Sequence, residues 1–104
     1  MAFDEALAER VRTLLAGRPG LTERKMFGGL GFMLHGNMCC GVHGDELIIR
    51  VAPERTTEAL SRPHTREFDM TGRPMKGWLL VSSEANVNEW VDEAADYAAS
   101  LPPK

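Results

Sequence analysis

The sequence predicts an α+β domain, with an antiparallel β-sheet built on a three-stranded meander and packed by N- and C-terminal α-helices. Two turn-forming dipeptides, Gly36-Asn37 and Gly44-Asp45, separate three runs of six residues, which is the pattern of two consecutive β-hairpins. Both ends of the chain repeat apolar residues at spacings of three and four, as amphipathic helices do. Residues 1–104 are expected to form one domain, because a chain of this length can bury an adequate core without disulfides or metal.

The first element is expected to be an amphipathic helix over residues 3–16. Its apolar face would be formed by Phe3, Leu7, Val11, Leu14 and Leu15. Asp4 is suited to cap the N-terminus of this helix, and Gly17 is suited to end it. Residues 24–27 are then expected to form a short strand that ends before a pair of glycines.

The meander follows, with strands expected at residues 30–35, 38–43 and 46–51. Two-residue turns at Gly36-Asn37 and Gly44-Asp45 set the pairing. In this register, the numbers of two residues that face each other across the first turn add up to 73. Those of two residues that face each other across the second turn add up to 89.

This pairing assigns each meander side chain to one of two faces. The predicted core face consists of Gly31, Met33, His35, Met38, Cys40, Val42, Leu47, Ile49 and Val51. The second face consists of Leu30, Phe32, Leu34, Cys39, Gly41, His43, Glu46, Ile48 and Arg50. On that face Phe32 would lie over Gly41. Because the second face is also partly apolar, we expect a helix or a second subunit to cover it in part, so a homodimer is one interpretation.

Two short elements and a turn are expected after the meander. Pro53 is suited to the first turn of a helix that runs through Leu60. Residues 66–70 alternate as in a strand, and residues 71–74 are expected to form a turn.

The chain is expected to end in a strand over residues 78–81 and an amphipathic helix. The apolar face of that helix would be formed by Val87, Trp90, Val91, Ala94, Tyr97, Ala98 and Leu101. Asn86 with Glu89 resembles a capping box, and Pro102-Pro103 would end the helix.

The composition is that of an ordinary globular protein, with 43% hydrophobic residues, 26% charged residues and a formal net charge of -3. No apolar run reaches the roughly 20 residues that span a bilayer, and the N-terminus lacks the basic and apolar segments of a signal peptide. We therefore expect a cytoplasmic protein that does not associate with membranes. The basic excess between residues 18 and 83 is small, which argues against direct nucleic-acid binding.

The adjacent residues Cys39 and Cys40 are the most conspicuous chemical feature. Neighbouring residues of a strand point to opposite faces, so the two sulfurs are expected neither to bind one metal ion nor to meet each other. His43 is four residues from Cys39 along the strand, about 13 Å, which is too far for it to act as the base of a nucleophilic cysteine. The spacing of the three histidines also does not match a zinc site. We therefore expect no catalytic residue, metal or cofactor, and two small buried cysteines.

One alternative function depends on Cys39 alone. The predicted register makes Arg50 its cross-strand neighbour, and a nearby cation favours the thiolate form of cysteine. A thiol-based redox sensor or weak metal binder centred on Cys39 is therefore retained as an alternative.

Two segments contribute candidate interaction residues. If their basic side chains converge, they form a small patch, and weak nucleic-acid binding through it is a further alternative. The glycines of "FGGLGF" match no phosphate-binding loop, so we expect them to permit a bulge or close backbone approach at the sheet edge. The candidate interaction residues are Arg24, Lys25, Phe27, Gly28, Gly29, Arg73, Lys76 and Trp78.

Three stretches of the chain, "RKMFGGLGFMLHGNMCCGVHGDELIIRV", "ALSRPHTREFDMTGRPMKGW" and the acidic last helix with "SLPPK", resemble the TfoX N-terminal domain family. The resemblance implies a compact α+β domain that often occurs as an independent small protein. In longer bacterial TfoX or Sxy proteins it precedes a C-terminal domain and belongs to a regulator of competence genes that works with a cyclic-AMP receptor protein. The family implies no catalytic residues. We therefore expect a single-domain, non-enzymatic, transcription-related regulatory module with a protein partner.

Overall fold

The structure is a computed structural model that describes residues 3–26, 28–69, 72 and 75–103. Within these residues, six strands form one antiparallel sheet in the order β1-β2-β3-β4-β6-β5. The strands are β1 (Leu21–Met26), β2 (Gly29–Leu34), β3 (Asn37–His43), β4 (Glu46–Arg50), β5 (Thr65–Glu67) and β6 (Trp78–Ser82). The helices are α1 (Glu5–Leu15), α2 (Thr56–Leu60) and α3 (Val87–Ala99), with a 3-10 turn at Pro53–Arg55.

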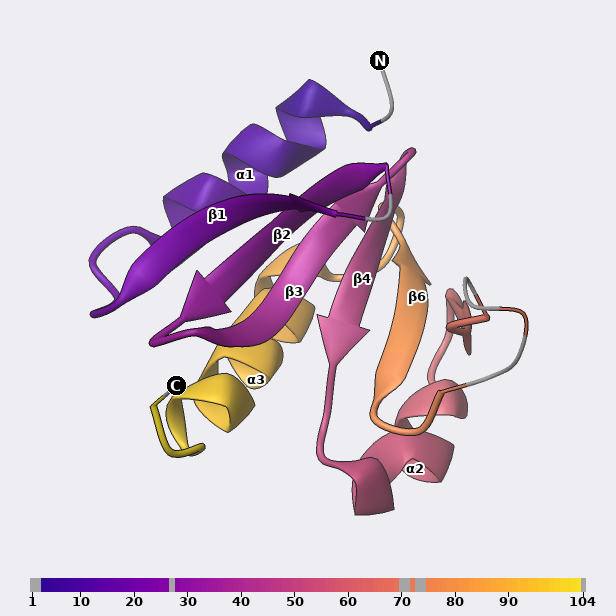
Figure 1. Ribbon diagram of the computed structural model, residues 1–104. Coiled ribbons are helices and arrows are strands. Elements are labelled where there is room, and N and C mark those ends of the chain that lie inside the picture. The colour runs from indigo at the N-terminus through magenta and orange to yellow at the C-terminus, as the bar shows by residue number, and fades with distance from the viewer. Residues whose placement is uncertain (1–2, 27, 70–71, 73–74, 104) are drawn as a thin grey trace.

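The helices from the two ends of the chain lie against the same face of the sheet. Figure 1 shows α1 and α3 behind the strands, whereas α2 lies below β4 and β6. This arrangement confirms the predicted α+β fold with terminal helices. None of the helices in the described ranges has the length and apolar character needed to cross a membrane.

The N-terminal helix forms as predicted, but it begins two residues later and ends one residue earlier than expected. The Asp4 carboxylate accepts hydrogen bonds from the backbone N–H groups of Ala6 (2.9 Å) and Leu7 (3.2 Å), which caps the helix. Gly17 follows the helix in a left-handed conformation, with φ at +90°. The next strand, β1, begins earlier than predicted, at Leu21.

The second predicted hairpin is confirmed. His43 lies opposite Glu46 and Val42 opposite Leu47, as the predicted sum of 89 requires. The turn uses Gly44-Asp45, and Gly44 has the positive φ expected at this position.

The turn of the first hairpin lies one residue earlier than predicted. Leu34 pairs with Asn37, so the turn residues are His35 and Gly36 and not Gly36-Asn37. Both turn residues have positive φ, 51° and 83°, as a type I′ turn requires. Asn37 is buried in β3, and its side-chain amide donates a hydrogen bond to the carbonyl of Pro102 (2.9 Å). This hydrogen bond satisfies the side-chain amide of Asn37 at its buried position in β3.

A β-bulge in β3 changes the register a second time. Met33 pairs with Met38 but Phe32 pairs with Cys40, so Cys39 is an extra residue without a cross-strand partner in β2. The predicted sum of 73 is therefore wrong along the whole hairpin, and Phe32 does not lie opposite Gly41.

The changed register reverses part of the predicted face assignment. A slip of one residue turns every side chain of a strand to the other face. In β2 the residues packed toward the helices are Leu30, Phe32 and Leu34, the reverse of the prediction. The bulge lets the remainder of β3 and β4 keep their predicted core residues, including Cys40, Val42, Leu47 and Ile49. Met38 precedes the bulge and lies on the opposite side.

The elements after the meander agree with the prediction in order and type. The predicted strand over residues 66–70 is shorter, at Thr65–Glu67, and most of the predicted turn at 71–74 lies outside the described residues. The last helix begins at Asn86, whose side chain accepts a hydrogen bond from the Glu89 N–H (3.2 Å) and donates one to the Glu89 carboxylate (2.8 Å). Of its predicted apolar residues, Tyr97 and Leu101 are half-buried and the others are buried.

Arg62 joins α2 to α3. Its guanidinium makes paired contacts with the carboxylates of Glu93 (2.7 and 2.9 Å) and Glu58 (2.9 and 3.0 Å). It also lies over the Trp90 ring, 4.5 Å from the centroid. Hydrogen bonds from Arg62, and secondarily from Arg55, lower the pKa of Glu58 to about 2.

We predict that Gly41→Ala destabilises the protein by about 2 to 3 kcal/mol. A Cβ at this position would lie 2.6 Å from the Leu30 carbonyl oxygen, so the β2 and β3 backbones would have to separate. Gly17→Ala is the matched control, because its Cβ would meet nothing and only the left-handed backbone is unfavourable, about 1 kcal/mol. Urea unfolding measures the loss in the free energy of unfolding for both variants. Equal losses would contradict the close approach of the two strands.

We predict that the Glu58 carboxyl titrates with a midpoint of about 2, below its ordinary 4.5. Because the folded-state pKa is depressed, this group stabilises the fold above about pH 4.5 and loses that effect as the pH falls through about 2. NMR titration of the side-chain carboxyl carbon measures the midpoint. Arg62→Gln should raise it, whereas Arg10→Gln should not, because Arg10 contacts Asn88. An unchanged midpoint in Arg62→Gln would refute the assignment.

Candidate interaction surface

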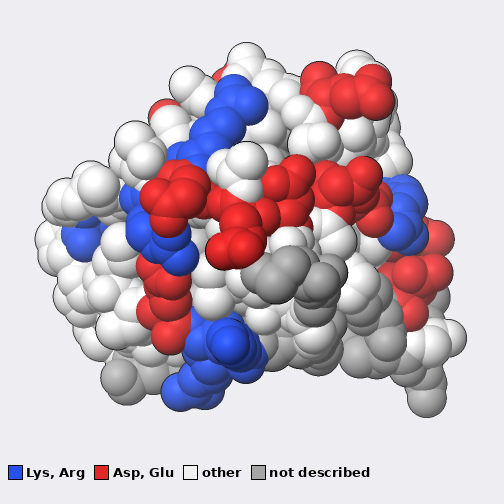
Figure 2. Space-filling model, turned by 90° about the horizontal axis from the view of Figure 1, so that it is seen from above, with Lys and Arg blue, Asp and Glu red and all other residues white. Residues whose placement is uncertain are grey.

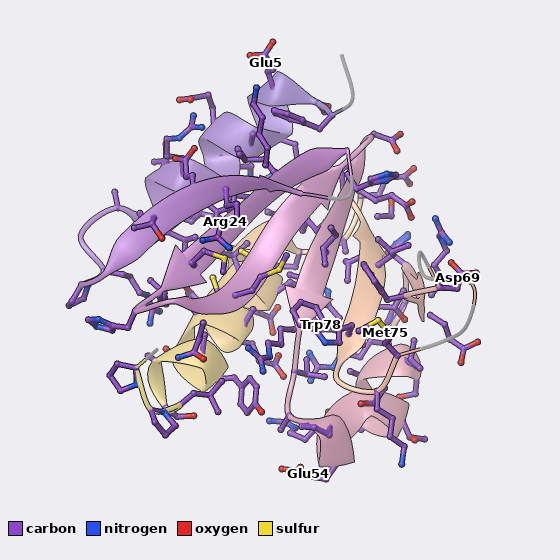
Figure 3. The ribbon with its side chains drawn as sticks, in the orientation of Figure 1. Glu5, Arg24, Glu54, Asp69, Met75 and Trp78 are labelled. Atoms are coloured by element: carbon purple, nitrogen blue, oxygen red, sulfur yellow. The ribbon has the colours of Figure 1, made fainter. Side chains whose placement is uncertain are left out.

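The sheet face opposite α1 and α3, here called the open face, bears no helix in the part of the chain that the structure describes. Side chains that are cross-strand partners share a face, so the registers assign its members. These are Thr22, Arg24, Gly31, Met33, Met38, Gly41, His43, Glu46, Ile48, Arg50, Arg66, Trp78, Leu80 and Ser82. Figure 3 shows Arg24, Met75 and Trp78 on the near side of the sheet, away from the two long helices.

The centre of the open face is apolar. Four buried side chains, Met38, Ile48, Phe68 and Leu80, form a cluster there. Met33, Met75 and Trp78 pack on this cluster and remain half-exposed. Methionine and tryptophan are enriched in protein interfaces, and the unbranched methionine side chain adapts to different partners.

Arg50 connects the open face to the last helix. Its guanidinium lies 5.3 Å from the ring centroid of Trp78 and 5.7 Å from that of Tyr97 on α3. One of its nitrogens donates a hydrogen bond to the Met38 carbonyl (3.2 Å). The expectation that Arg50 acts on Cys39 is therefore replaced by contacts with two rings and a backbone carbonyl.

The basic candidate residues are separated by the sheet. Arg24 and Lys25 are exposed neighbours on β1. Lys25 is the cross-strand partner of Leu30, which packs toward the helices, so Lys25 lies on the helix side and Arg24 on the open face. Lys76 precedes β6, and four strand spacings of sheet, about 19 Å, separate β6 from β1. The convergence on which the basic-patch alternative depends is therefore not found among these three residues.

The remaining candidates are placed as follows. Gly28 is exposed in the β1–β2 turn with a φ of +73°, and Gly29 is buried at a position where an added Cβ would clash with the Val42 carbonyl oxygen of β3. The close backbone approach expected of these glycines is confirmed, although β2 is an inner strand and not the edge. Phe27 and Arg73 lie outside the described residues.

The cations of the open face are unevenly paired. Glu46 lies opposite His43 as expected, but its carboxylate binds Arg66 through two contacts (2.6 and 3.0 Å). Among the described residues, no carboxylate lies at ion-pair distance from Arg24 or Arg50. The open face therefore combines apolar side chains with two cations that have no acidic partner there.

Elsewhere the charges are mixed. Figure 2 shows acidic side chains in a band across the surface seen from above, with basic side chains on either side of it. A hollow of about 320 Å³ next to α3 is lined by Arg55 and Glu93, which already pair with each other at 3.6 Å. Neither surface offers the clustered cations that nucleic-acid binding requires.

The two cysteines do meet, which contradicts the sequence-based prediction. Their sulfurs lie 3.6 Å apart, and both side chains are buried in the core on the helix side of the sheet. The bulge explains this, because Cys39 is the extra residue and leaves the strict alternation of β3. The meander itself is retained. Within the described residues, no three His, Cys, Asp or Glu side chains gather as a metal site.

The close sulfurs change each other's acidity. The Cys40 thiol lowers the pKa of Cys39, and the positive charge of Arg18 acts in the same direction against the effect of burial. Conversely, Cys39 and burial raise the pKa of Cys40 well above its ordinary range. Arg18, in the loop after α1, thus takes the role that the sequence suggested for Arg50.

The model of the TfoX N-terminal domain family matches residues 13–100. Neither the curated proteins nor the solved structures include a significant match to the chain.

Proposed function

The chain belongs to the TfoX N-terminal domain family, and from this premise we propose that it is a non-enzymatic, cytoplasmic regulatory module that binds a partner protein. The resemblance to domains of competence regulators supports a transcription-related role. The open face is the proposed binding surface.

The observation that supports this function best is the combination of side chains on the open face. Met33, Met75 and Trp78 are half-exposed over a buried apolar cluster, and Arg24 and Arg50 lie on the same face without a carboxylate partner among the described residues. Apolar area contributes most of the free energy of association, whereas charges select the partner. The proposed partner is therefore a protein segment with both apolar and acidic side chains.

Arg50 adds geometric specificity to this surface. Because it is held by Trp78, Tyr97 and the Met38 carbonyl, its guanidinium loses little conformational freedom when a carboxylate binds. The half-exposed methionines can adjust to the shape of an apolar segment beside it.

We predict that Arg24→Glu weakens partner binding about tenfold, which is ~1.4 kcal/mol, because it places a negative charge on the open face. Lys25→Glu is the matched control, since it makes the same charge change at the adjacent residue on the opposite face of β1. A partner would first be captured from extracts of the source cells, identified and purified, and calorimetry would then measure its affinity for the three chains. Equal affinities for the two variants would contradict binding at the open face.

A second copy of the chain is another occupant of the open face. If it binds there, light scattering of the purified protein at increasing concentration should show twice the mass of one chain, and Arg24→Glu should change the midpoint of assembly more than Lys25→Glu. A constant mass of one chain rejects the homodimer. DNA binding predicts a different result, a gel shift that salt weakens and that both substitutions reduce alike.

A further inference from the structure

Cys39 and Cys40 are placed to react with each other. We propose that they form a dithiol that a small hydroperoxide, such as hydrogen peroxide, converts reversibly into a disulfide. This inference concerns the interior of the protein and does not depend on the function proposed for the open face.

The geometry of the bulge supports this assignment. In a regular strand, adjacent side chains point to opposite faces and their sulfurs cannot meet. Here both sulfurs lie in the same core at 3.6 Å, and a disulfide bond of about 2.05 Å requires them to approach by about 1.6 Å. The bulge has already placed both sulfurs on one face of the sheet. Forming the disulfide therefore requires only side-chain rotation and a modest backbone adjustment.

The two sulfurs have different roles in the reaction. The Cys39 thiolate attacks one oxygen of hydrogen peroxide, the O–O bond breaks, and the departing hydroxide takes a proton to become water. Cys39 is now a sulfenic acid. The Cys40 sulfur then attacks the Cys39 sulfur, the S–O bond breaks, and the hydroxide leaves as water with the Cys40 proton. In total, two thiols and one hydrogen peroxide give one disulfide and two waters, with the thiols oxidised and the peroxide reduced.

The surroundings of the pair favour Cys39 as the attacking sulfur. The neighbouring Cys40 thiol and then the Arg18 charge lower the pKa of Cys39, whereas Cys40 is held protonated. Arg18 itself is tied to Asp96 of α3 (3.0 Å), so its charge is held in place near the pair. The first step needs the sulfur that loses its proton more readily, and the second step needs a neighbouring thiol that supplies a proton.

The burial of the two cysteines limits which oxidants can reach them. Both cysteines have 0% exposure, so a reagent reaches them only when the core opens locally. A molecule of the size of hydrogen peroxide needs a much smaller opening than glutathione disulfide. The Cα atoms of adjacent residues are about 3.8 Å apart, closer than the usual 4.4 Å or more in disulfides, so the product is strained and easily reduced. These properties fit a reversible modification better than a structural crosslink.

The test is mass spectrometry of the folded chain after treatment with hydrogen peroxide. The expected product has lost the mass of two hydrogen atoms, contains an intramolecular link between Cys39 and Cys40, and returns to the dithiol with dithiothreitol. Its melting temperature should be lower than that of the reduced chain, because the strained ring lies in the core. Persistence of both thiols in the folded chain, with oxidation seen only in urea, would overturn the proposal.

Two serine variants separate the roles of the sulfurs. In Cys40→Ser the reaction should stop at the sulfenic acid, which dimedone traps, and this adduct should be several-fold more abundant than in the wild type. Cys39→Ser should remain largely unmodified. Equal trapping in the wild type and Cys40→Ser, disulfides between chains, or sulfinic acid on both residues would each reject the dithiol mechanism. The wild-type measurement decides the matter even if a variant does not fold.

Discussion

The extra residue of β3, Cys39, is the constraint on which the rest of the sheet depends. Met38 pairs with Met33 before it and Cys40 pairs with Phe32 after it. The alternation of side chains between the two faces of the sheet is therefore interrupted partway along β3. This change lets β2 direct its large apolar side chains to α1 and α3 while the two methionines go to the other side. The apolar character of the open face and the contact between the two sulfurs therefore share one backbone cause.

The fold class and most elements could be predicted because their signals are local. Gly44-Asp45 specifies the β3–β4 turn, and Asp4 and Asn86 cap helices through their own side chains. The β2–β3 register could not be predicted for two reasons. His35 adopts a left-handed conformation in the turn, and Asn37 is held in β3 by Pro102, a residue far away in the sequence.

The candidate surface could be predicted only in part. Alternation places Arg24 and Lys25 on opposite faces of β1 once the pairing with β2 is known. The contacts of Arg50 with Trp78 and Tyr97 join β4 to β6 and α3, and no spacing along the chain indicates them. Similarly, the role of Arg18 near Cys39 depends on how the loop after α1 meets the last helix. Long-range packing decides these features.

The hydrogen bond between Asn37 and Pro102 also has a geometric meaning for anything joined to this domain. It anchors the polypeptide just after α3 beside the tip of the β2–β3 hairpin, so the exit point of the chain is held to the sheet. A segment attached beyond it would leave from that place in a direction set by the hairpin. The two consecutive prolines that follow α3 would restrict the backbone conformation at the start of that segment.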